Sequence, residues 1–516
     1  MLAKVHSAAL QGLDAQPVIV EVDNFDAGQT AKFTIVGLPD NAVKESQERV
    51  QSALRVNGYK APFKSVVVNL APADMRKEGS GFDLPVAIGV LCSYEFLSID
   101  QPERFMFVGE LGLGGEVLPV KGVLPISIKA RELGYEALFV PEENAREAAV
   151  VNNLKVYGVK HLNEIVGFFS GTTSILPTIV NTREEFYSQL FTFPYDFDEV
   201  KGQENVKRAF EVAAAGGHNI ILVGSPGCGK SMMAKRLPSI LPPLTLGESL
   251  ETTQIHSIAG KLKKEDSLIS QRPFRAPHHT VSDVALVGGG LNPQPGEISL
   301  AHNGVLFADE LPEFSKTTLE VLRQPLEDRR ITISRNKYTL EFPCSFMFVA
   351  SMNPCPCGYY GDHTHNCVCS PGQIQRYMNK ISGPLLDRID IQCEIQPVPF
   401  SDISTTKPGE PSSEIRRRVI AARAIQEERY KDFKEIHCNA QMTESMIHKY
   451  AVPDEAGFRL LSNAMERLSL SARAYSRILK VARTIADLDA SPSVSAQHIA
   501  EAIGYRNLDR GDWAER

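Results

Sequence analysis

The sequence predicts an α/β protein of several domains, built around a parallel sheet that carries a phosphate-binding loop. Three observations predict this fold class. An apolar run over residues 220–223 leads directly into a glycine-rich loop and then a helical pattern. Residues 1–168 alternate strand-like and helical stretches, which is typical of an α+β domain. In the last third of the chain, apolar residues recur at helical spacing and predict a helical domain.

The first domain is expected over residues 1–168. Its helical patterns are Asn41–Val56, Leu84–Tyr94 and Pro125–Leu133, and its strand-like runs are Val18–Val22, Val66–Leu70, Phe105–Val108 and Ala137–Val140. The small polar residues that follow, with Pro177, are typical of a connector, so we predict a linker over residues 169–196.

The remaining chain divides into a core and a helical lid. We predict the core over residues 197–399 and the lid over residues 400–516, with a Pro-, Ser- and Thr-rich connector at their junction. The helical patterns of the lid are Ile415–Tyr430, Glu455–Leu468, Ala472–Leu488 and Ser495–Ile503.

A complete G-x-x-x-x-G-K-[ST] pattern occupies the turn after the apolar run. It consists of Gly224, Ser225, Pro226, Gly227, Cys228, Gly229, Lys230 and Ser231. The glycines let backbone N–H groups converge on phosphates, Lys230 supplies charge to the β and γ oxygens, and Ser231 offers a hydroxyl to Mg²⁺. A chance glycine-rich turn is disfavoured because all eight positions match in the required context. The loop predicts binding of ATP and Mg²⁺.

A second nucleotide motif follows about 80 residues later, where the apolar run Val305–Ala308 ends in Asp309 and Glu310. Asp309 is placed to hold Mg²⁺, and Glu310 to polarise the attacking water as general base. An Asp-Glu pair after a strand is weak by itself, because such pairs are common at surface turns. Together with the phosphate loop it predicts an ATPase site.

Four cysteines lie within 15 residues of one another: Cys355, Cys357, Cys367 and Cys369. Four thiols at this density favour a tetrahedral Zn²⁺ site, with His363 and His365 as spare ligands. The C-x-C spacing is less typical than C-x₂-C, and free thiols in an exposed loop are the alternative. We expect this cysteine knuckle, residues 355–369, to project from the carboxyl edge of the sheet and to engage DNA rather than to take part in ATP chemistry.

Bulk properties indicate an intracellular enzyme. The chain has 516 residues, 43% of them hydrophobic and 23% charged, and includes nine cysteines. The sequence has no signal peptide pattern and no apolar stretch near the roughly 20 residues that a membrane span requires, so we expect a cytoplasmic protein. A net charge of −7 gives no overall nucleic-acid signature, and DNA binding must then use local basic patches.

Further motifs resemble the magnesium-chelatase-like branch of the AAA+ ATPases. Phe348–Asn353 is similar to the sensor strand, which implies that Asn353 positions the lytic water. Gly383–Asp390 is similar to the segment whose arginine reaches the neighbouring subunit's ATP, which implies this role for Arg388; pairing with a local aspartate is the alternative. Leu470–Arg473 resembles the second sensor, with Arg473 at the γ-phosphate and Arg477 as the competing candidate.

Nearly the whole chain resembles the ComM/YifB family within this branch. The resemblance rests on Phe33–Asp40, Arg272–Thr280, Gly289–Gly290 and Pro295–Ile298. It implies an ATP-dependent homo-hexameric motor that acts on single-stranded or branched DNA. The implied activity is that of a branch-migration helicase in homologous recombination and natural transformation, without a membrane partner.

In the first domain, Val108–Val117 and Pro119–Gly122 resemble the Lon protease fold. A Lon peptidase needs a serine hydroxyl beside a lysine base. The serine position falls near Gly81 and the lysine position near Ile126, while Ser80 and Lys129 are out of register. We therefore expect a structural, oligomer-building or DNA-guiding role for this domain rather than proteolysis.

A predicted hairpin over residues 330–340 has a basic tip that includes Arg335 and Lys337. In related ring helicases the equivalent hairpin lines the central pore, which implies that these two side chains hold DNA phosphates without reading sequence. A solvated hairpin tip is the alternative. The segment 272–279 is a second candidate contact, with His278 and His279 serving as phosphate or metal contacts or as packing groups.

Three classes of function fit these sequence features. The DNA motor leads, a chelatase-type motor that remodels a protein partner is the second, and an ATP-dependent Lon-like protease is disfavoured by the missing dyad. The sequence leaves open the direction of movement, the preferred DNA structure, the partner proteins and the requirements for assembly.

Overall fold

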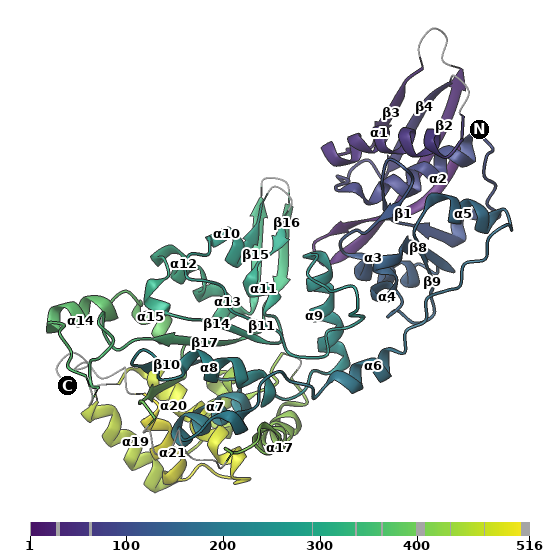
Figure 1. The fold of residues 1–516 in the computed structure, drawn as a ribbon. Coiled ribbons are helices and arrows are strands. Elements are labelled where there is room, and N and C mark those ends of the chain that lie inside the picture. The colour runs from purple at the N-terminus through teal and green to yellow at the C-terminus, as the bar shows by residue number, and fades with distance from the viewer. Residues whose placement is uncertain are drawn as a thin grey trace.

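The computed structural model describes residues 2–26, 31–60, 64–290, 293–335, 338–362, 365–398, 408–433, 435–468 and 470–506. Two large sheets organise this part of the chain, one near the N-terminus and one in the centre, and the C-terminal helices pack beneath the central sheet (Figure 1). The protein is therefore an α/β protein of several parts with a helical C-terminal region, as predicted.

The N-terminal sheet has seven strands in the order β3-β4-β2-β1-β5-β8-β9. Their bounds are β1 Ala3–Gln11, β2 Asp14–Asp26, β3 Phe33–Val36, β4 Lys64–Ala71, β5 Phe105–Phe107, β8 Ala137–Pro141 and β9 Lys155–Val159. β2 pairs antiparallel with β1 and β4, and the other pairings are parallel. Four of these strands coincide with the predicted runs, with β5 ending one residue before Val108, whereas β1, β3 and β9 were not predicted.

Three helices pack on this sheet near their predicted bounds: α1 Asn41–Val56, α2 Asp83–Ser93 and α3 Val123–Glu132. α1 begins where Asp40 accepts a hydrogen bond of 2.8 Å from the backbone N–H of Val43, which satisfies one free donor of the first turn. α2 is buried on almost every side, because it lies between the sheet and α1.

The central sheet is entirely parallel, with strand order β11-β14-β17-β10-β18. The strands are β10 Ile220–Gly224, β11 Phe274–Arg275, β14 Val305–Ala308, β17 Met347–Met352 and β18 Ile391–Ile395. Both faces are covered, so most residues of these strands are apolar. Ile220 and Leu222 share a core with the C-terminal helices, while Ile221 and Val223 face the core that includes the cysteine knuckle.

Five C-terminal helices pack with α7 (Glu204–Gly216) beneath this sheet (Figure 1). They are α17 Ser412–Tyr430, α18 Glu444–Tyr450, α19 Glu455–Arg467, α20 Ala472–Leu488 and α21 Ala496–Gly504. Four coincide with predicted helical patterns. α18 was not predicted, and most of the predicted connector over 401–411 lies outside the described residues.

The N-terminal part docks on helix α9 (Leu246–Ile258) of the central part. Ser257 carries two of these contacts: its hydroxyl donates to Glu147, and its carbonyl accepts from the Gly122 N–H at 3.1 Å. The predicted linker contributes helix α6 (Thr182–Gln189), whose Glu185 binds both Arg146 and Ser267. Helix α6 of the predicted linker therefore contacts both parts.

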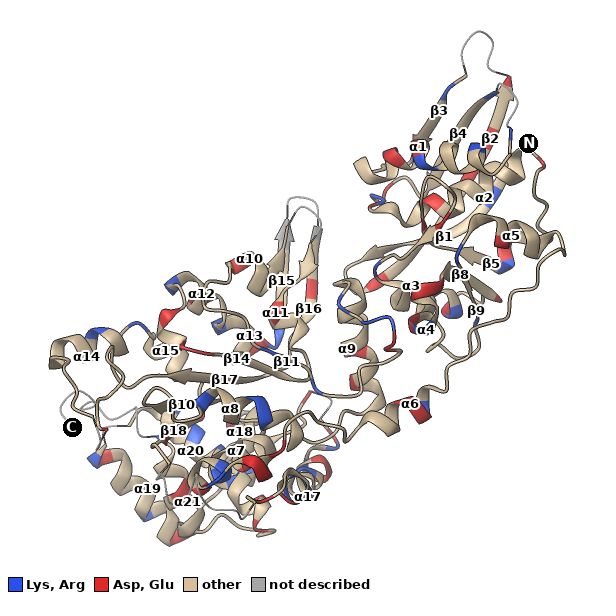
Figure 2. Ribbon diagram, in the orientation of Figure 1, with Lys and Arg blue, Asp and Glu red and all other residues tan. Residues whose placement is uncertain are grey.

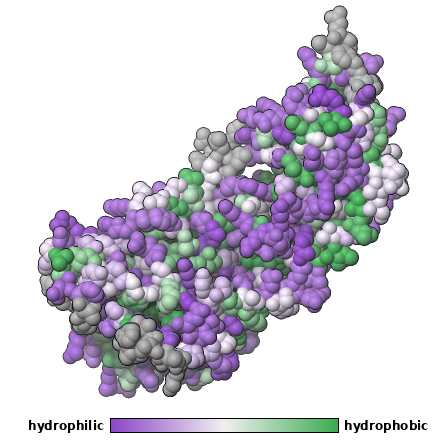
Figure 3. All heavy atoms as spheres, in the orientation of Figure 1, coloured by the Kyte–Doolittle hydropathy of each residue, from purple (hydrophilic) through white to green (hydrophobic). Residues whose placement is uncertain are grey.

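Lys and Arg side chains are intermixed with Asp and Glu along the whole ribbon (Figure 2). The face drawn in Figure 3 is mostly hydrophilic, with hydrophobic side chains scattered over it. Among the described helices, none combines the length and the apolar character that crossing a bilayer requires.

Candidate active site

The glycine-rich loop lies between β10 and helix α8 (Lys230–Arg236), at the carboxyl end of the parallel sheet. Gly227 and Gly229 have φ of 79° and 94°, a left-handed conformation that glycine adopts without strain. The helical pattern that follows the loop in the sequence forms a helix that starts at Lys230 and is followed by a 3₁₀ turn, Leu237–Ser239.

The Lys230 ammonium points back into the loop. It donates to the carbonyls of Gly224 and Ser225 at 2.6 and 3.0 Å, and to Oδ1 of Asn353 at 3.2 Å. Because an ammonium group is a mobile donor, phosphate oxygens can replace these acceptors when a nucleotide enters. The structure thus brings together two residues that the sequence predicted separately.

Asp309 follows β14 and faces Ser231. The Ser231 hydroxyl donates to Oδ2 of Asp309 at 2.7 Å. A hydroxyl and a carboxylate at this separation form an oxygen-rich pair suited to Mg²⁺. β14 and β17 are parallel neighbours, with Ala308 opposite Ala350, so their carboxyl ends meet at this edge.

Ser351 connects Asp309 and Glu310 at this end of the sheet, and the sequence analysis did not identify it. Its hydroxyl donates to Oδ1 of Asp309 and accepts from the Glu310 N–H at 3.2 Å. Ser351 is fully buried in a strand whose other members are apolar or sulfur-containing. A single hydroxyl inside such a strand was the signal available in the sequence.

Glu310 stands at the mouth of the site. Its φ is 54°, and its side chain is 57% exposed. Nδ1 of His279 lies 3.8 Å from Oε2 of Glu310, and the ring of His278 lies 4.1 Å from the His279 ring. The histidine pair left open by the sequence therefore lies next to the predicted general base.

A cleft of about 490 Å³ opens beside this site. Glu310 and Asn353 line one part of it, and Pro356 and Cys369 of the cysteine knuckle line another. Helix α14 (Pro371–Met378) contributes further lining residues. The knuckle is therefore adjacent to the predicted catalytic carboxylate.

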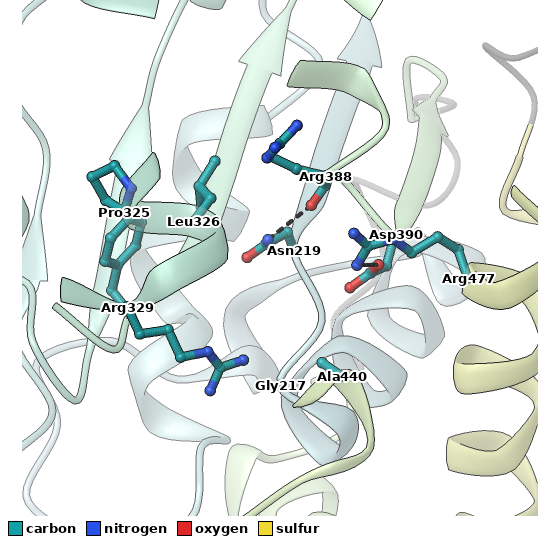
Figure 4. Close-up of a pocket in the computed structure, with 10 residues that line it drawn as sticks. Gly217, Asn219, Pro325, Leu326, Arg329, Arg388, Asp390, Ala440 and Arg477 are labelled. Atoms are coloured by element: carbon teal, nitrogen blue, oxygen red, sulfur yellow. Dashed lines mark hydrogen bonds and ion pairs between the residues drawn. The ribbon is translucent and has the colours of Figure 1, made fainter. Parts of the chain in front are cut away.

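Arg388 lies at the opposite end of the parallel strands, where they begin. It lines a small pocket that also includes Arg329 and Arg477 (Figure 4). Its backbone carbonyl accepts from Asn219 at 2.9 Å, and Asn219 directly precedes β10. The glycine-rich loop follows the other end of β10. Five strand residues span roughly 16 Å, so Arg388 is remote from its own chain's loop.

The Arg388 guanidinium binds the carbonyl of Pro384 at 2.7 Å and the carboxylate of Glu327. Within the described part of the chain, its Nε is buried without a hydrogen-bond partner. Arg388 does not form the ion pair with Asp387 or Asp390 that the sequence left open as the alternative. Those two aspartates bind other arginines.

Arg473 and Arg477, the two candidates for the second sensor, lie at the same edge as Arg388. Arg473 binds Asp387 at 2.8 Å and Arg477 binds Asp390 at 2.7 Å. Burial opposes ionisation of Asp390, but Arg477 and His218 outweigh it and hold its pKa well below the usual range. The structure does not bring these arginines to Lys230 or Glu310 of their own chain.

The four cysteines of the knuckle converge. Their sulfur atoms all lie within 4.8 Å of one another, and the separations from Cys355 are 3.3 Å to Cys357 and 3.7 Å to Cys367. Zinc–sulfur bonds of about 2.3 Å in a tetrahedron place sulfurs about 3.8 Å apart. The donor set therefore fits Zn²⁺.

The surroundings of Cys357 favour a thiolate. Burial opposes ionisation, but hydrogen bonds from the backbone N–H groups of Tyr359 and Val368 and from neighbouring thiols outweigh it and lower the pKa of Cys357 to about 6. Burial raises the pKa of Cys367 and of Cys369 in the same cluster. Of the two spare ligands, His365 has its Nδ1 3.7 Å from Asp362 and is not part of the sulfur cluster. His363 lies outside the described residues.

The predicted hairpin forms, with β15 Arg330–Arg335 antiparallel to β16 Tyr338–Pro343. Its tip residue Lys337 and the side chain of Arg335 lie outside the described residues. Lower down, Cδ2 of Leu340 lies 3.3 Å from where a Cβ on Gly12 would stand. The hairpin therefore contacts the β1–β2 turn of the N-terminal sheet.

The two residues nearest to the expected dyad positions, Ser80 and Lys129, each contact a carboxylate. The Ser80 hydroxyl binds Glu110, and Lys129 binds Glu132 at 2.8 Å. At the expected positions themselves stand Gly81, in a 3₁₀ turn, and the buried Ile126 in α3.

Comparison with known proteins gives family matches along most of the chain. Residues 196–403 match the family described as magnesium chelatase, subunit ChlI. Residues 20–144 match the subunit ChlI of Mg-chelatase family, and residues 409–506 match the ChlI C-terminal family.

Full-length relatives are also found. The chain is 43% identical to the competence protein ComM of Haemophilus influenzae, over 99% of this chain and 98% of that protein. It is 42% identical to the uncharacterized protein YifB of Salmonella typhimurium, with the same coverage. A partial similarity, 26% over 162 residues, links 29% of the chain to 28% of Lon protease 2 of Bacillus subtilis.

Proposed function

The chain belongs to the ComM/YifB family of magnesium-chelatase-like AAA+ ATPases, and we propose that it is a hexameric, ATP-driven DNA motor that catalyses branch migration. The proposal rests on one combination of observations: the chain has an assembled nucleotide site, and it is similar over nearly its full length to a competence protein. Competence is the uptake of DNA, so the name of this relative supports DNA as the substrate of the proposed motor.

In the proposed cycle, the loop N–H groups and Lys230 bind the phosphates of ATP. Ser231 and Asp309 hold Mg²⁺, which neutralises charge on the phosphates when it is bound. Glu310 accepts a proton from the attacking water, and Asn353 orients that water. The 3.2 Å contact between Asn353 and Lys230 supports this assignment, because it places the amide beside the group that binds the γ-phosphate.

Arg388 acts on the ATP of a neighbouring subunit in this proposal. Its position beyond the far end of β10 supports the assignment, because a guanidinium there can reach a nucleotide only across an interface. Arg473 lies at the same edge and would complete the charge around that γ-phosphate. Alternating sites and arginines support a closed ring, and the number of six subunits is what the family resemblance implies.

The hairpin β15–β16 is the proposed DNA contact, through Arg335 and Lys337. Its basic tip supports this role, because cations on a projecting hairpin bind backbone phosphates without regard to sequence. The substrates we propose are single-stranded or branched DNA, as met in homologous recombination and natural transformation. We place the activity in the cytoplasm, and Zn²⁺ on the four knuckle cysteines is part of the proposal.

A chelatase-type motor that remodels a protein partner is the second candidate, favoured by the three chelatase-named matches. Because residues 20–144 match one of these families, the N-terminal domain does not by itself separate the two functions. A Lon-like protease has no support from the contacts of Ser80 and Lys129.

The deciding experiment measures ATP hydrolysis with no DNA, with single-stranded DNA and with forked DNA, followed by branch migration of a synthetic junction. We expect DNA to stimulate hydrolysis and ATP to drive strand exchange. Arg335→Ala with Lys337→Ala should weaken DNA binding and flatten its salt dependence, whereas Lys155→Ala, an exposed lysine on β9, should not. A rate of ATP hydrolysis that neither single-stranded nor forked DNA changes would contradict the DNA motor and favour the chelatase-type alternative.

A further inference from the structure

The cysteine knuckle touches the phosphate loop directly. The Ser225 hydroxyl, on the second residue of the loop, donates to Oδ2 of Asp362 at 2.6 Å. Asp362 lies in the knuckle, between Cys357 and Cys367, and its side chain is 1% exposed. A buried hydrogen bond therefore connects the two segments.

A second contact is steric. Gly358 has φ of 88°, and a Cβ on it would stand 2.6 Å from Cδ of Pro226. The backbone of the knuckle thus packs against the loop so closely that a side chain at residue 358 would collide with it. Two consecutive loop residues, Ser225 and Pro226, are each contacted by the knuckle.

The rest of the knuckle fixes where Asp362 stands. Cys355 is fully buried in the core on the face of the sheet opposite the C-terminal helices, and the other three thiols lie close to it. The second carboxylate oxygen of Asp362 accepts from the His365 N–H at 3.1 Å. A segment this short gains little from apolar burial, so metal binding would supply most of the free energy that orders it.

We propose that a Zn²⁺ ion on Cys355, Cys357, Cys367 and Cys369 orders Asp362 so that it holds Ser225, and thereby keeps the phosphate loop shaped for nucleotide. Asp362 is a positioning residue in this view. Its negative charge repels phosphate, so its benefit comes from restraint of the loop and not from attraction. The proposal rests on ATP being the ligand of that loop, as in the proposed function.

This role of the knuckle and the expected role in DNA engagement predict different nucleotide affinities. If the knuckle served DNA alone, loss of the metal would leave nucleotide affinity unchanged. If the knuckle restrains the loop, affinity falls even when no DNA is present. The contacts of Ser225 and Pro226 with the knuckle favour the second outcome.

The test measures zinc content by elemental analysis and affinity for a fluorescent ATP analogue with Mg²⁺, on full-length protein without DNA. Cys369→Ser should lose most of the metal and bind the analogue at least tenfold more weakly. Asp362→Ala should keep the metal yet lose about tenfold in affinity, the size of one hydrogen bond to a charged group. Asp362→Asn should restore most of that loss, because it keeps an acceptor and removes the repulsive charge.

Two comparisons control the test. Val368→Ala, at an 84% exposed side chain between two of the ligands, should change neither metal content nor affinity. In a Ser225→Ala background, Asp362→Ala should add little further loss, because the two residues act through one hydrogen bond. Circular dichroism checks that each variant is folded.

Unchanged affinity in folded Asp362→Ala protein, or in zinc-free wild-type protein, would overturn the proposal. Wild-type protein that binds no nucleotide would instead contradict the proposed function. Wild-type protein that binds nucleotide but fails to move DNA would contradict the motor alone.

Discussion

The side-chain amide of Asn219 binds the backbone carbonyl of Arg388, and this contact fixes the arginine at the edge of the sheet where β10 begins. Lys230 lies beyond the edge where β10 ends. The two cationic groups that the sequence assigns to one phosphate chain therefore stand at opposite ends of the same strand. In the proposed function, where both groups act on one ATP, a complete site therefore uses two copies of the chain.

Arg388→Ala protein should bind ATP normally and hydrolyse it slowly, because its own phosphate loop is intact. Mixed with Lys230→Ala protein, it should recover part of the hydrolysis, since some interfaces then pair a working loop with a working arginine. The measurement is ATPase activity over a range of mixing ratios, with subunit exchange shown by fluorescence transfer. Exchange without any recovery would indicate that Arg388 acts within its own subunit or only in folding.

Lys230→Ala should abolish nucleotide binding, whereas Glu310→Gln should bind ATP and hydrolyse it at least 100-fold more slowly. The reason is that Lys230 contacts ground-state phosphates, while Glu310 acts on the attacking water. Equilibrium binding and single-turnover hydrolysis separate the two effects. Normal turnover by either variant would remove the residue from the site.

Arg477→Ala and Arg473→Ala should differ in stability. Arg477 neutralises Asp390, whose side chain is 1% exposed, so its loss leaves a buried charge and should cost about 3 kcal/mol. Arg473 is 71% exposed, and its loss should cost under about 1 kcal/mol. Urea unfolding of both variants checks this. A result in which Arg473→Ala lowers only ATP hydrolysis would support it as the second sensor, and equal destabilisation would contradict the contrast.

Glu147 should make the contact with α9 depend on pH. Burial raises the pKa of Glu147 above its ordinary value of 4.5, despite hydrogen bonds that oppose the shift. A raised pKa means that the folded state holds the proton more tightly, so this contribution is full below about pH 4.5 and is lost as pH rises through the folded pKa.

The comparison that isolates this effect is with Glu147→Gln, which keeps an acceptor for Ser257 and has no proton to lose. Melting temperatures of both proteins between about pH 5 and pH 8 should show the wild type losing stability relative to the variant as pH rises. A constant difference between them across that range would contradict the raised pKa.

Local patterns were sufficient for much of this protein. An apolar strand, eight loop positions and a helix define the phosphate loop wherever they occur, because backbone geometry alone shapes that site. α20 was predicted with its observed bounds, since its apolar face repeats at helical spacing. Strand β1, at Ala3–Gln11, was missed, because its mixed polar and apolar residues give no regular alternation.

Other features were decided by tertiary structure. The sequence places Arg388, Arg473 and Arg477 near a nucleotide but cannot say whose, and only the parallel strand order puts all three at the edge away from Lys230. The bond between Ser225 and Asp362 joins residues that lie 137 positions apart. Such contacts form because the carboxyl ends of parallel strands lie side by side. The local hydrophobic periodicity of a sequence does not specify which loops will meet there.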